Sequence, residues 1–190
     1  MPLRLHSLAT IGLFLLVSAC GTDNILSGSP INDDQRIRSS AFYVAGTGQF
    51  PTTIQGNPSN LRDAAFRDAV LGVLRLPAGL PATAFTLVPD PPVRHTYRLV
   101  LIFAPRNKAL SAMTVCSENA DIPVSRAKDE LLFLKAAYCH RSQALSETFG
   151  ETTITDYRSE KFRTLMFVVM EQLFPPSKAD GEYCVLRLTC

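Results

Sequence analysis

Apolar residues recur every three or four positions between residues 60 and 74, which is the pattern of an amphipathic helix. Ser59 or Asn60 can accept hydrogen bonds from the first free amides of such a helix, and Pro77 ends the run. We therefore expect a helix that begins near residue 60 and packs one face on a core. The apolar stripe comprises Leu61, Ala65, Phe66, Ala69, Val70, Val73 and Leu74.

Two longer segments have the pattern of strands. In residues 97–103, alternate positions are all apolar, so that one face of a strand would cover a core, and Pro105 follows. Residues 131–140 (LLFLKAAYCH) predict a longer strand, although their Leu, Lys and Ala also suit a helix.

Shorter patterns complete the predicted element order. Residues 41–45, 112–116 and 183–188 predict short strands, the first ending at a Gly-Thr-Gly sequence. Five prolines make residues 77–92 an extended connector, with a short strand at 85–88. A second helix is expected over 159–173, ended by two prolines, with an apolar face of Phe162, Leu165, Met166, Val169 and Leu173.

This order predicts the fold class. Two amphipathic helices and several strands joined by short connections suit an α+β domain, in which both helices pack on one face of a mainly antiparallel sheet. Residues 41–190 have the length of one such domain.

The N-terminal segment has the layout of an export signal. Arg4 precedes a mainly apolar run, residues 8–17, and small residues follow. A membrane-spanning helix needs about 20 apolar residues. Polar residues from Gly21 to Asn24 end this run too early. We therefore expect residues 1–19 to be a cleaved signal peptide.

The segment Leu16-Val17-Ser18-Ala19-Cys20 resembles the lipobox of bacterial lipoproteins, with Val17 in place of the commoner leucine. The resemblance covers only the first twenty or so residues. It implies that Cys20 is acylated and becomes the first residue of the mature protein. Gly21, where an aspartate would mark retention in the inner membrane, implies an outer-membrane lipoprotein facing the periplasm. The alternative is an ordinary secretory signal in which Cys20 has no such role.

The residues after Cys20 predict a tether. Residues 21–40 (GTDNILSGSPINDDQRIRSS) are polar and have little periodicity, so we expect residues 20–40 to be a lipidated cysteine and a flexible linker.

Charge argues against a nucleic-acid partner. Loss of residues 1–19 removes Arg4 from the 19 basic residues, leaving 18 against 17 acidic ones. Nucleic-acid binders normally have a strong basic excess or patch. We expect the membrane, through the lipid, and an envelope protein to be the partners.

The remaining cysteines agree with export. Cys116, Cys139, Cys184 and Cys190 allow up to two disulfides in an oxidising compartment. Cys184 and Cys190 would lie about 20 Å apart on one strand, beyond the roughly 7 Å that a disulfide spans. Of the three pairings we favour Cys116–Cys139, since both lie in apolar, strand-like segments. The alternative for each cysteine is a buried free thiol.

Patterns for metal or cofactor chemistry are absent from the sequence. After signal cleavage only His95 and His140 remain, without C-x-x-C or H-E-x-x-H spacing, so we expect no metal and no cofactor. Cys139 and His140 would point to opposite faces of a strand and could not pair. The sequence Gly46-Thr47-Gly48 lacks the third glycine and the adjacent helix of a phosphate-binding turn.

One weak catalytic pattern is present. Ser125 and Lys128 have S-x-x-K spacing, in which a lysine can activate a serine, but the S-D-N and K-T-G motifs that accompany it in penicillin-binding enzymes are missing. We therefore expect no catalytic residue.

A non-catalytic binding or assembly module best fits these patterns. In element order the chain is similar to small accessory lipoproteins of the cell envelope, including those that regulate peptidoglycan synthases or assemble secretion pores. No motif carries this similarity, so no residue role follows from it. One alternative is a small periplasmic hydrolase, which would use either Ser125 with Lys128, or His140 with a distant serine and carboxylate. The other is a carrier of an apolar ligand.

Overall fold

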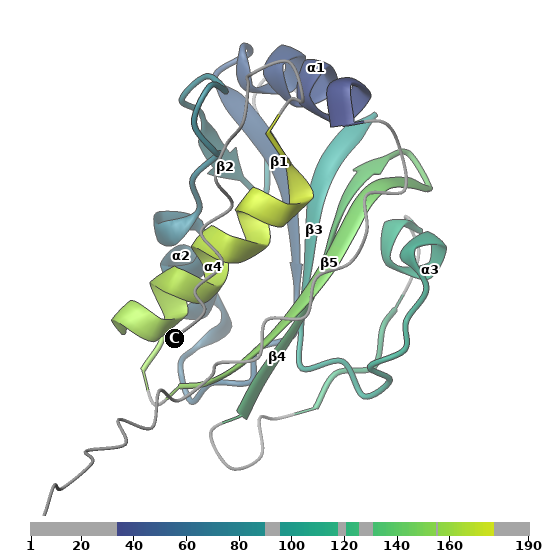
Figure 1. Ribbon diagram of the computed structural model, residues 1–190. Coiled ribbons are helices and arrows are strands. Elements are labelled where there is room, and N and C mark those ends of the chain that lie inside the picture. Colours follow the sequence, from purple (N-terminus) through teal and green to yellow (C-terminus); the bar gives the residue numbers. More distant parts are fainter. Residues whose placement is uncertain (1–33, 90–95, 118–120, 126–130, 155, 177–190) are drawn as a thin grey trace, which may run out of the picture.

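The computed structural model describes residues 34–89, 96–117, 121–125, 131–154 and 156–176 (Figure 1). These residues form four helices and five strands. In chain order the elements are α1 (Asp34–Ala45), β1 (Gln49–Gln55), α2 (Asp63–Val73), β2 (Ala84–Thr86), β3 (Tyr97–Phe103), α3 (Ala112–Cys116), β4 (Leu131–His140), β5 (Gln143–Thr153) and α4 (Glu160–Leu173). Several predicted features lie outside the described residues: the signal peptide, Cys20, Lys128, and the strand at 183–188 with Cys184 and Cys190.

The strands form one mixed sheet in the order β2-β1-β3-β4-β5. β1 pairs in parallel with β2 and β3, while the longer pairings of β4 with β3 and β5 are antiparallel. The predicted α+β class is therefore confirmed. The strands predicted at 97–103 and 131–140 are confirmed over the same residues.

The larger core lies between one face of the sheet and α1, α2 and α4. Leu99, Leu101 and Phe103 of β3 contribute to it, as the alternation predicted. Helix α4 begins as expected, because the Ser159 side chain accepts a hydrogen bond from the Phe162 amide. All five predicted apolar residues of α4 are buried. Figure 1 shows α2 and α4 in front of the sheet.

The opposite face of the sheet carries a second, smaller core. Val100 and Ile102, the alternate residues of β3, pack there against Val115 and Cys116 of α3. β3 is thus buried on both faces, whereas the sequence pattern assigned only one face to a core. The strand predicted at 112–116 is wrong: this segment is α3, whose first turn is capped by Ser111 accepting from the Thr114 amide.

The predicted beginning of the domain is also wrong. Residues 34–40, assigned to the tether, and residues 41–45, assigned to a strand, together form α1. Ile37, Ala41, Val44 and Ala45 are buried at the spacing of one helix face. The folded part of the chain therefore includes residues from Asp34 onward.

Helix α2 is confirmed but starts later than expected. Its N-cap is Arg62, with no side-chain cap bond, rather than Ser59 or Asn60. The Ser59 hydroxyl instead accepts from the Leu61 amide within the preceding loop. The buried face of the helix is made by Phe66 and Val70.

Candidate functional site

A disulfide joins Cys116 of α3 to Cys139 of β4, as we expected, with the two Cα atoms 5.6 Å apart. Both cysteines have no exposed surface. We expected both cysteines to lie in strands. This holds for Cys139, whereas Cys116 lies at the end of a helix. The disulfide fastens α3 to the second face of the sheet.

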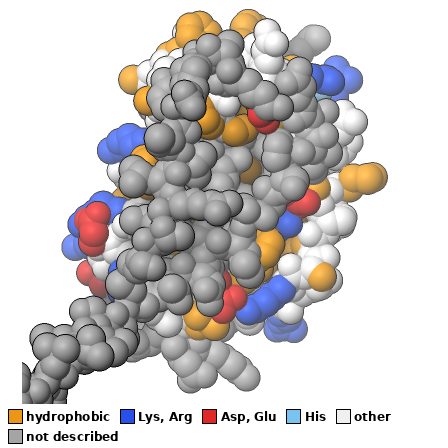
Figure 2. All heavy atoms as spheres, viewed as in Figure 1, with side chains coloured by type: hydrophobic (Ala, Val, Ile, Leu, Met, Phe, Trp, Pro, Cys, Tyr) orange, Lys and Arg blue, Asp and Glu red, His pale blue; other side chains and the backbone are white. Residues whose placement is uncertain are grey.

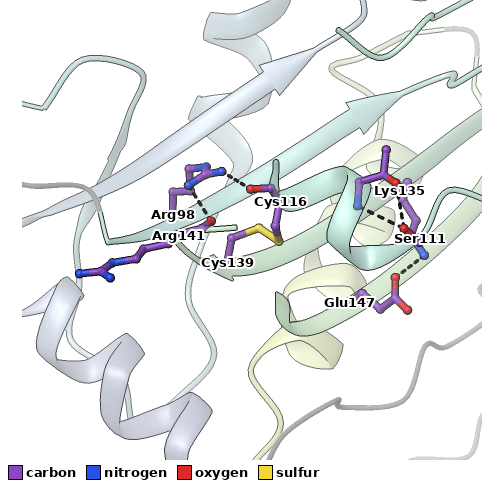
Figure 3. Close-up of a disulfide and its surroundings, with 8 residues drawn as sticks. Arg98, Ser111, Cys116, Lys135, Cys139, Arg141 and Glu147 are labelled. Carbon is purple, nitrogen blue, oxygen red and sulfur yellow. Dashed lines mark hydrogen bonds and ion pairs between the residues drawn. A yellow bond between two sulfur atoms is a disulfide. The ribbon is translucent and has the colours of Figure 1, made fainter. Parts of the chain in front are cut away.

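Arg98 supports this disulfide (Figure 3). It is the cross-strand partner of Cys139, and its guanidinium donates to the carbonyl oxygen of Cys116 at 2.5 Å and to that of Arg141 at 3.0 Å. These bonds join the end of α3 to the β4–β5 turn. Because an attacking thiolate needs access to sulfur, a disulfide buried in this way is structural rather than catalytic.

Charged pairs occupy the β4–β5 half of the same face. The Lys135 Nζ lies 2.6 Å from Glu147 Oε2, and the Lys108 Nζ lies 3.2 Å from Glu151 Oε2. The Lys108 ammonium also lies 4.9 Å from the centroid of the Phe133 ring. Each of these two lysines is paired with its own carboxylate, so the two ion pairs carry no net charge. They therefore do not point to a binding site for a charged ligand.

The two starting points for a hydrolase are far apart. The Ser125 hydroxyl donates to the Ala104 carbonyl oxygen at 3.2 Å, beside the first residues of β4. His140 is the last residue of β4, and its ring stacks on that of Tyr97 with the centroids 4.5 Å apart. The seven residue steps from Phe133 to His140 span about 23 Å of strand, so Ser125 and His140 do not belong to one site.

The strand that we placed at 41–45 was expected to end at Gly46-Thr47-Gly48, but this sequence follows helix α1 and leads into β1. The Gly46 and Gly48 amides donate to the carbonyl oxygens of Phe42 and Ala45, both at 2.9 Å. A phosphate-binding turn needs free amides at the start of a helix. The Gly-Thr-Gly sequence therefore ends α1, with Gly48 at a positive φ of 83°.

A groove of about 390 Å³ lies between α2 and α4. Its apolar surface includes the phenyl ring of Phe167, which is 60% exposed, and Val73. A Cβ placed on Gly72 would meet no atom within 4 Å, so the groove is open at this point. The full lining is Gly72, Val73, Arg75, Glu160, Arg163, Thr164 and Phe167.

Two guanidinium groups border the groove. Arg163 donates to Glu160 Oε2 from Nε at 2.9 Å and from Nη2 at 2.7 Å, and to the Arg158 carbonyl oxygen at 2.8 Å. Arg75 donates to the Leu74 carbonyl oxygen at 2.5 Å. Glu160 offsets only one of the two positive charges. The groove thus offers an apolar contact beside a net positive charge.

The sequence patterns did not single out any residue of this groove as a functional residue. The sequence nevertheless contains a signal at Phe167, since this large apolar side chain lies outside the predicted apolar face of its helix. Gly72 carried another, because glycine inside a helix lowers stability and therefore calls for a reason.

Helix α1 is held firmly at the other end of α4. Arg38 donates to the carbonyl oxygens of Phe174 and Pro175, just beyond α4, and of Ala78. Burial raises the pKa of Glu171, and the nearby Arg38 opposes that shift. On the core side, the Tyr138 hydroxyl donates to Ser40 Oγ at 3.2 Å, and burial raises the pKa of Tyr138.

Within the described ranges, no group of three or more His, Cys, Asp or Glu side chains is placed to hold a metal ion. None of the helices in the same ranges has the length and apolar character needed to cross a membrane. Comparisons with protein-family models, curated proteins and solved structures give no significant match to this chain.

Proposed function

We propose that this chain is a non-catalytic module, anchored through lipid on Cys20 to the periplasmic face of the outer membrane, that binds a polypeptide segment of an envelope partner. The groove between α2 and α4 is the observation that carries the binding role. It presents the Phe167 ring and the open surface at Gly72 beside Arg75 and Arg163. A segment with an apolar side chain next to a carboxylate complements this chemistry.

Two observations support the anchored, exported location. The lipobox resemblance gives Cys20 a chemical role, and two or three acyl chains hold a protein far more firmly than one. The Cys116–Cys139 disulfide is of the kind that persists in oxidising compartments and is rare in the cytosol of mesophiles. Both agree with a domain that works in the periplasm.

Site-specific crosslinking in intact cells tests the binding role. A photoreactive amino acid in place of Phe167 is expected to capture one dominant envelope protein. The matched control is the same replacement at Met113 of α3, which is 75% exposed but belongs to the helix on the opposite face of the sheet. Capture from Met113 alone, or equal capture from both positions, contradicts the proposal.

A second pair of variants separates binding in the groove from contact by chance. Gly72→Gln places a side chain in the groove and is expected to abolish the crosslink, while Gly72→Ala adds one methyl group and is expected to retain it. The crosslink should also survive Ser125→Ala and His140→Ala. A crosslink that persists in Gly72→Gln shows that the groove does not bind the partner.

A further inference from the structure

Helix α1 exposes two adjacent aromatic side chains. Phe42 is 56% exposed and Tyr43 is 73% exposed, while Ile37, Ala41, Val44 and Ala45 of the same helix are buried. Ser39, one turn earlier, and Arg36, about two turns earlier, are also exposed on this side of the helix. In Figure 2, apolar side chains are exposed at the upper end of the molecule, where Figure 1 places α1. Contiguous exposed apolar side chains of this kind mark surfaces that bind a partner or a membrane.

The pair is held in a fixed direction. Arg38 ties α1 to the end of α4, and Ser40 receives the hydrogen bond of the buried Tyr138. Both residues lie within five positions of Tyr43. The helix is therefore fixed with Phe42 and Tyr43 on its exposed side.

Chain length places α1 close to the lipid of the proposed anchor. Thirteen residues, 21–33, separate Cys20 from Asp34, the first residue of α1. Even fully extended, the fourteen steps from Cys20 to Asp34 span at most about 50 Å. Among the described residues, α1 is the helix closest in sequence to Cys20, so the shortest stretch of chain joins it to the proposed anchor.

We propose that the outer face of α1, formed by Phe42 and Tyr43 with Arg36, lies on the bilayer interface. This docking rests on the proposed lipid anchor. Aromatic rings favour the boundary between headgroups and acyl chains, and a basic side chain beside them suits anionic headgroups. The lipid gives attachment, and the aromatic face gives orientation.

The orientation matters for the groove. α1 contacts the carboxyl end of α4 through Arg38, whereas the groove is lined by Glu160, Arg163 and Phe167 from the first half of α4. Docking of α1 on the bilayer therefore holds the groove toward the periplasm, where a partner can enter it.

The chain contains no tryptophan, so one introduced tryptophan reports its own surroundings. Tyr43→Trp and Phe167→Trp, each made in the full acylated chain, are reconstituted into vesicles of phosphatidylethanolamine and phosphatidylglycerol containing brominated lipid. Trp at position 43 is expected to emit at shorter wavelength and to be quenched several-fold more strongly than Trp at position 167. Both substituted side chains are largely exposed, so the fold should tolerate either change.

The outcomes separate docking from anchoring. If the protein stays on the vesicles but neither tryptophan is quenched, the docking is wrong and the anchor stands. Equal quenching at both positions also overturns the docking, since no face is then preferred. A shift at position 43 without lipid quenching, which grows with protein density, indicates that a second copy covers α1 instead. Protein that leaves the vesicles overturns the anchor, and with it the docking that depends on it.

Discussion

The Arg98 guanidinium donates a hydrogen bond to the carbonyl oxygen of Cys116 at 2.5 Å. The last residue of α3 is thereby held twice, by this bond and by its disulfide to Cys139. Helix α3 has only five residues, too few to be stable alone in water. Its position on the second face of the sheet depends on these two links.

Loss of the disulfide is expected to lower the free energy of unfolding substantially. The cysteines are 23 residues apart in sequence. Closing a loop of this length stabilises the folded state by about 3 kcal/mol in the chain-entropy model. Cys116→Ala with Cys139→Ala should cost about this much in urea unfolding, and a reductant should weaken the parent protein but not the variant. Equal stability of the parent with and without reductant contradicts the role of the disulfide.

Two glycines form a matched pair of tests. Gly56 has a φ of 81°, and a Cβ there would collide with the backbone carbonyl oxygen of Phe103. Gly56→Ala should therefore destabilise the fold by about 1–3 kcal/mol. Gly72→Ala meets open space inside a helix and should stabilise it by about 0.5–1 kcal/mol. Thermal melts of both variants check the contrast, and two changes of the same sign would contradict it.

Substitutions of Lys135 and Glu147, which form an ion pair, are expected to have strongly non-additive effects on the free energy of unfolding. The Lys135 side chain is 9% exposed, so Glu147→Gln leaves a nearly buried ammonium without its carboxylate. We expect Glu147→Gln to cost about 1–3 kcal/mol. Adding Lys135→Met should recover much of this loss. A double-mutant cycle measured by urea unfolding tests the coupling, and simple additivity of the two changes would refute it.

Alkaline pH should weaken the fold through Tyr157. Burial raises its pKa from 10.0 to about 12. Above pH 10 the unfolded chain releases the Tyr157 proton while the folded chain keeps it. The contribution of Tyr157 to the free energy of unfolding is therefore fully present below pH 10 and is lost as the pH rises toward 12. Tyr157→Phe keeps the ring and removes the titration. Its unfolding free energy should fall less steeply between pH 10 and 12 than that of the parent, and an unchanged slope would show that Tyr157 does not contribute.

Hydrophobic patterns located the elements whose buried faces are apolar, namely β3, β4, α2 and α4. They failed for β5, because its face toward α4 is formed by small or polar residues. Ser146 and Thr148 on that face are fully buried, yet they are satisfied by the Leu173 carbonyl oxygen and the Gln172 side chain. Gly150 lets the Leu165 side chain approach closely. No apolar alternation could indicate such a strand.

The two segments predicted as strands but found as helices have other causes. In α1, the buried residues follow helical spacing, but the exposed Phe42 and Tyr43 between them are also apolar. Residues 41–45 therefore form a continuous apolar run with the composition of a strand. In α3, the cap at Ser111 and the disulfide favour a helix and outweigh the strand propensity of residues 112–116. The disulfide pairing itself could be predicted, whereas the groove could not, because it depends on how α2 and α4 lie side by side.

Acylation of Cys20 is the most direct test of the proposed function. Cells that express the full chain or Cys20→Ser are grown with a clickable fatty-acid analogue, and the label on the purified protein is measured. The full chain should carry the label and fractionate with the outer membrane, and Cys20→Ser should carry none and be released or misprocessed. Equal labelling of the two proteins, or an unlabelled full chain, would contradict a lipid-anchored module.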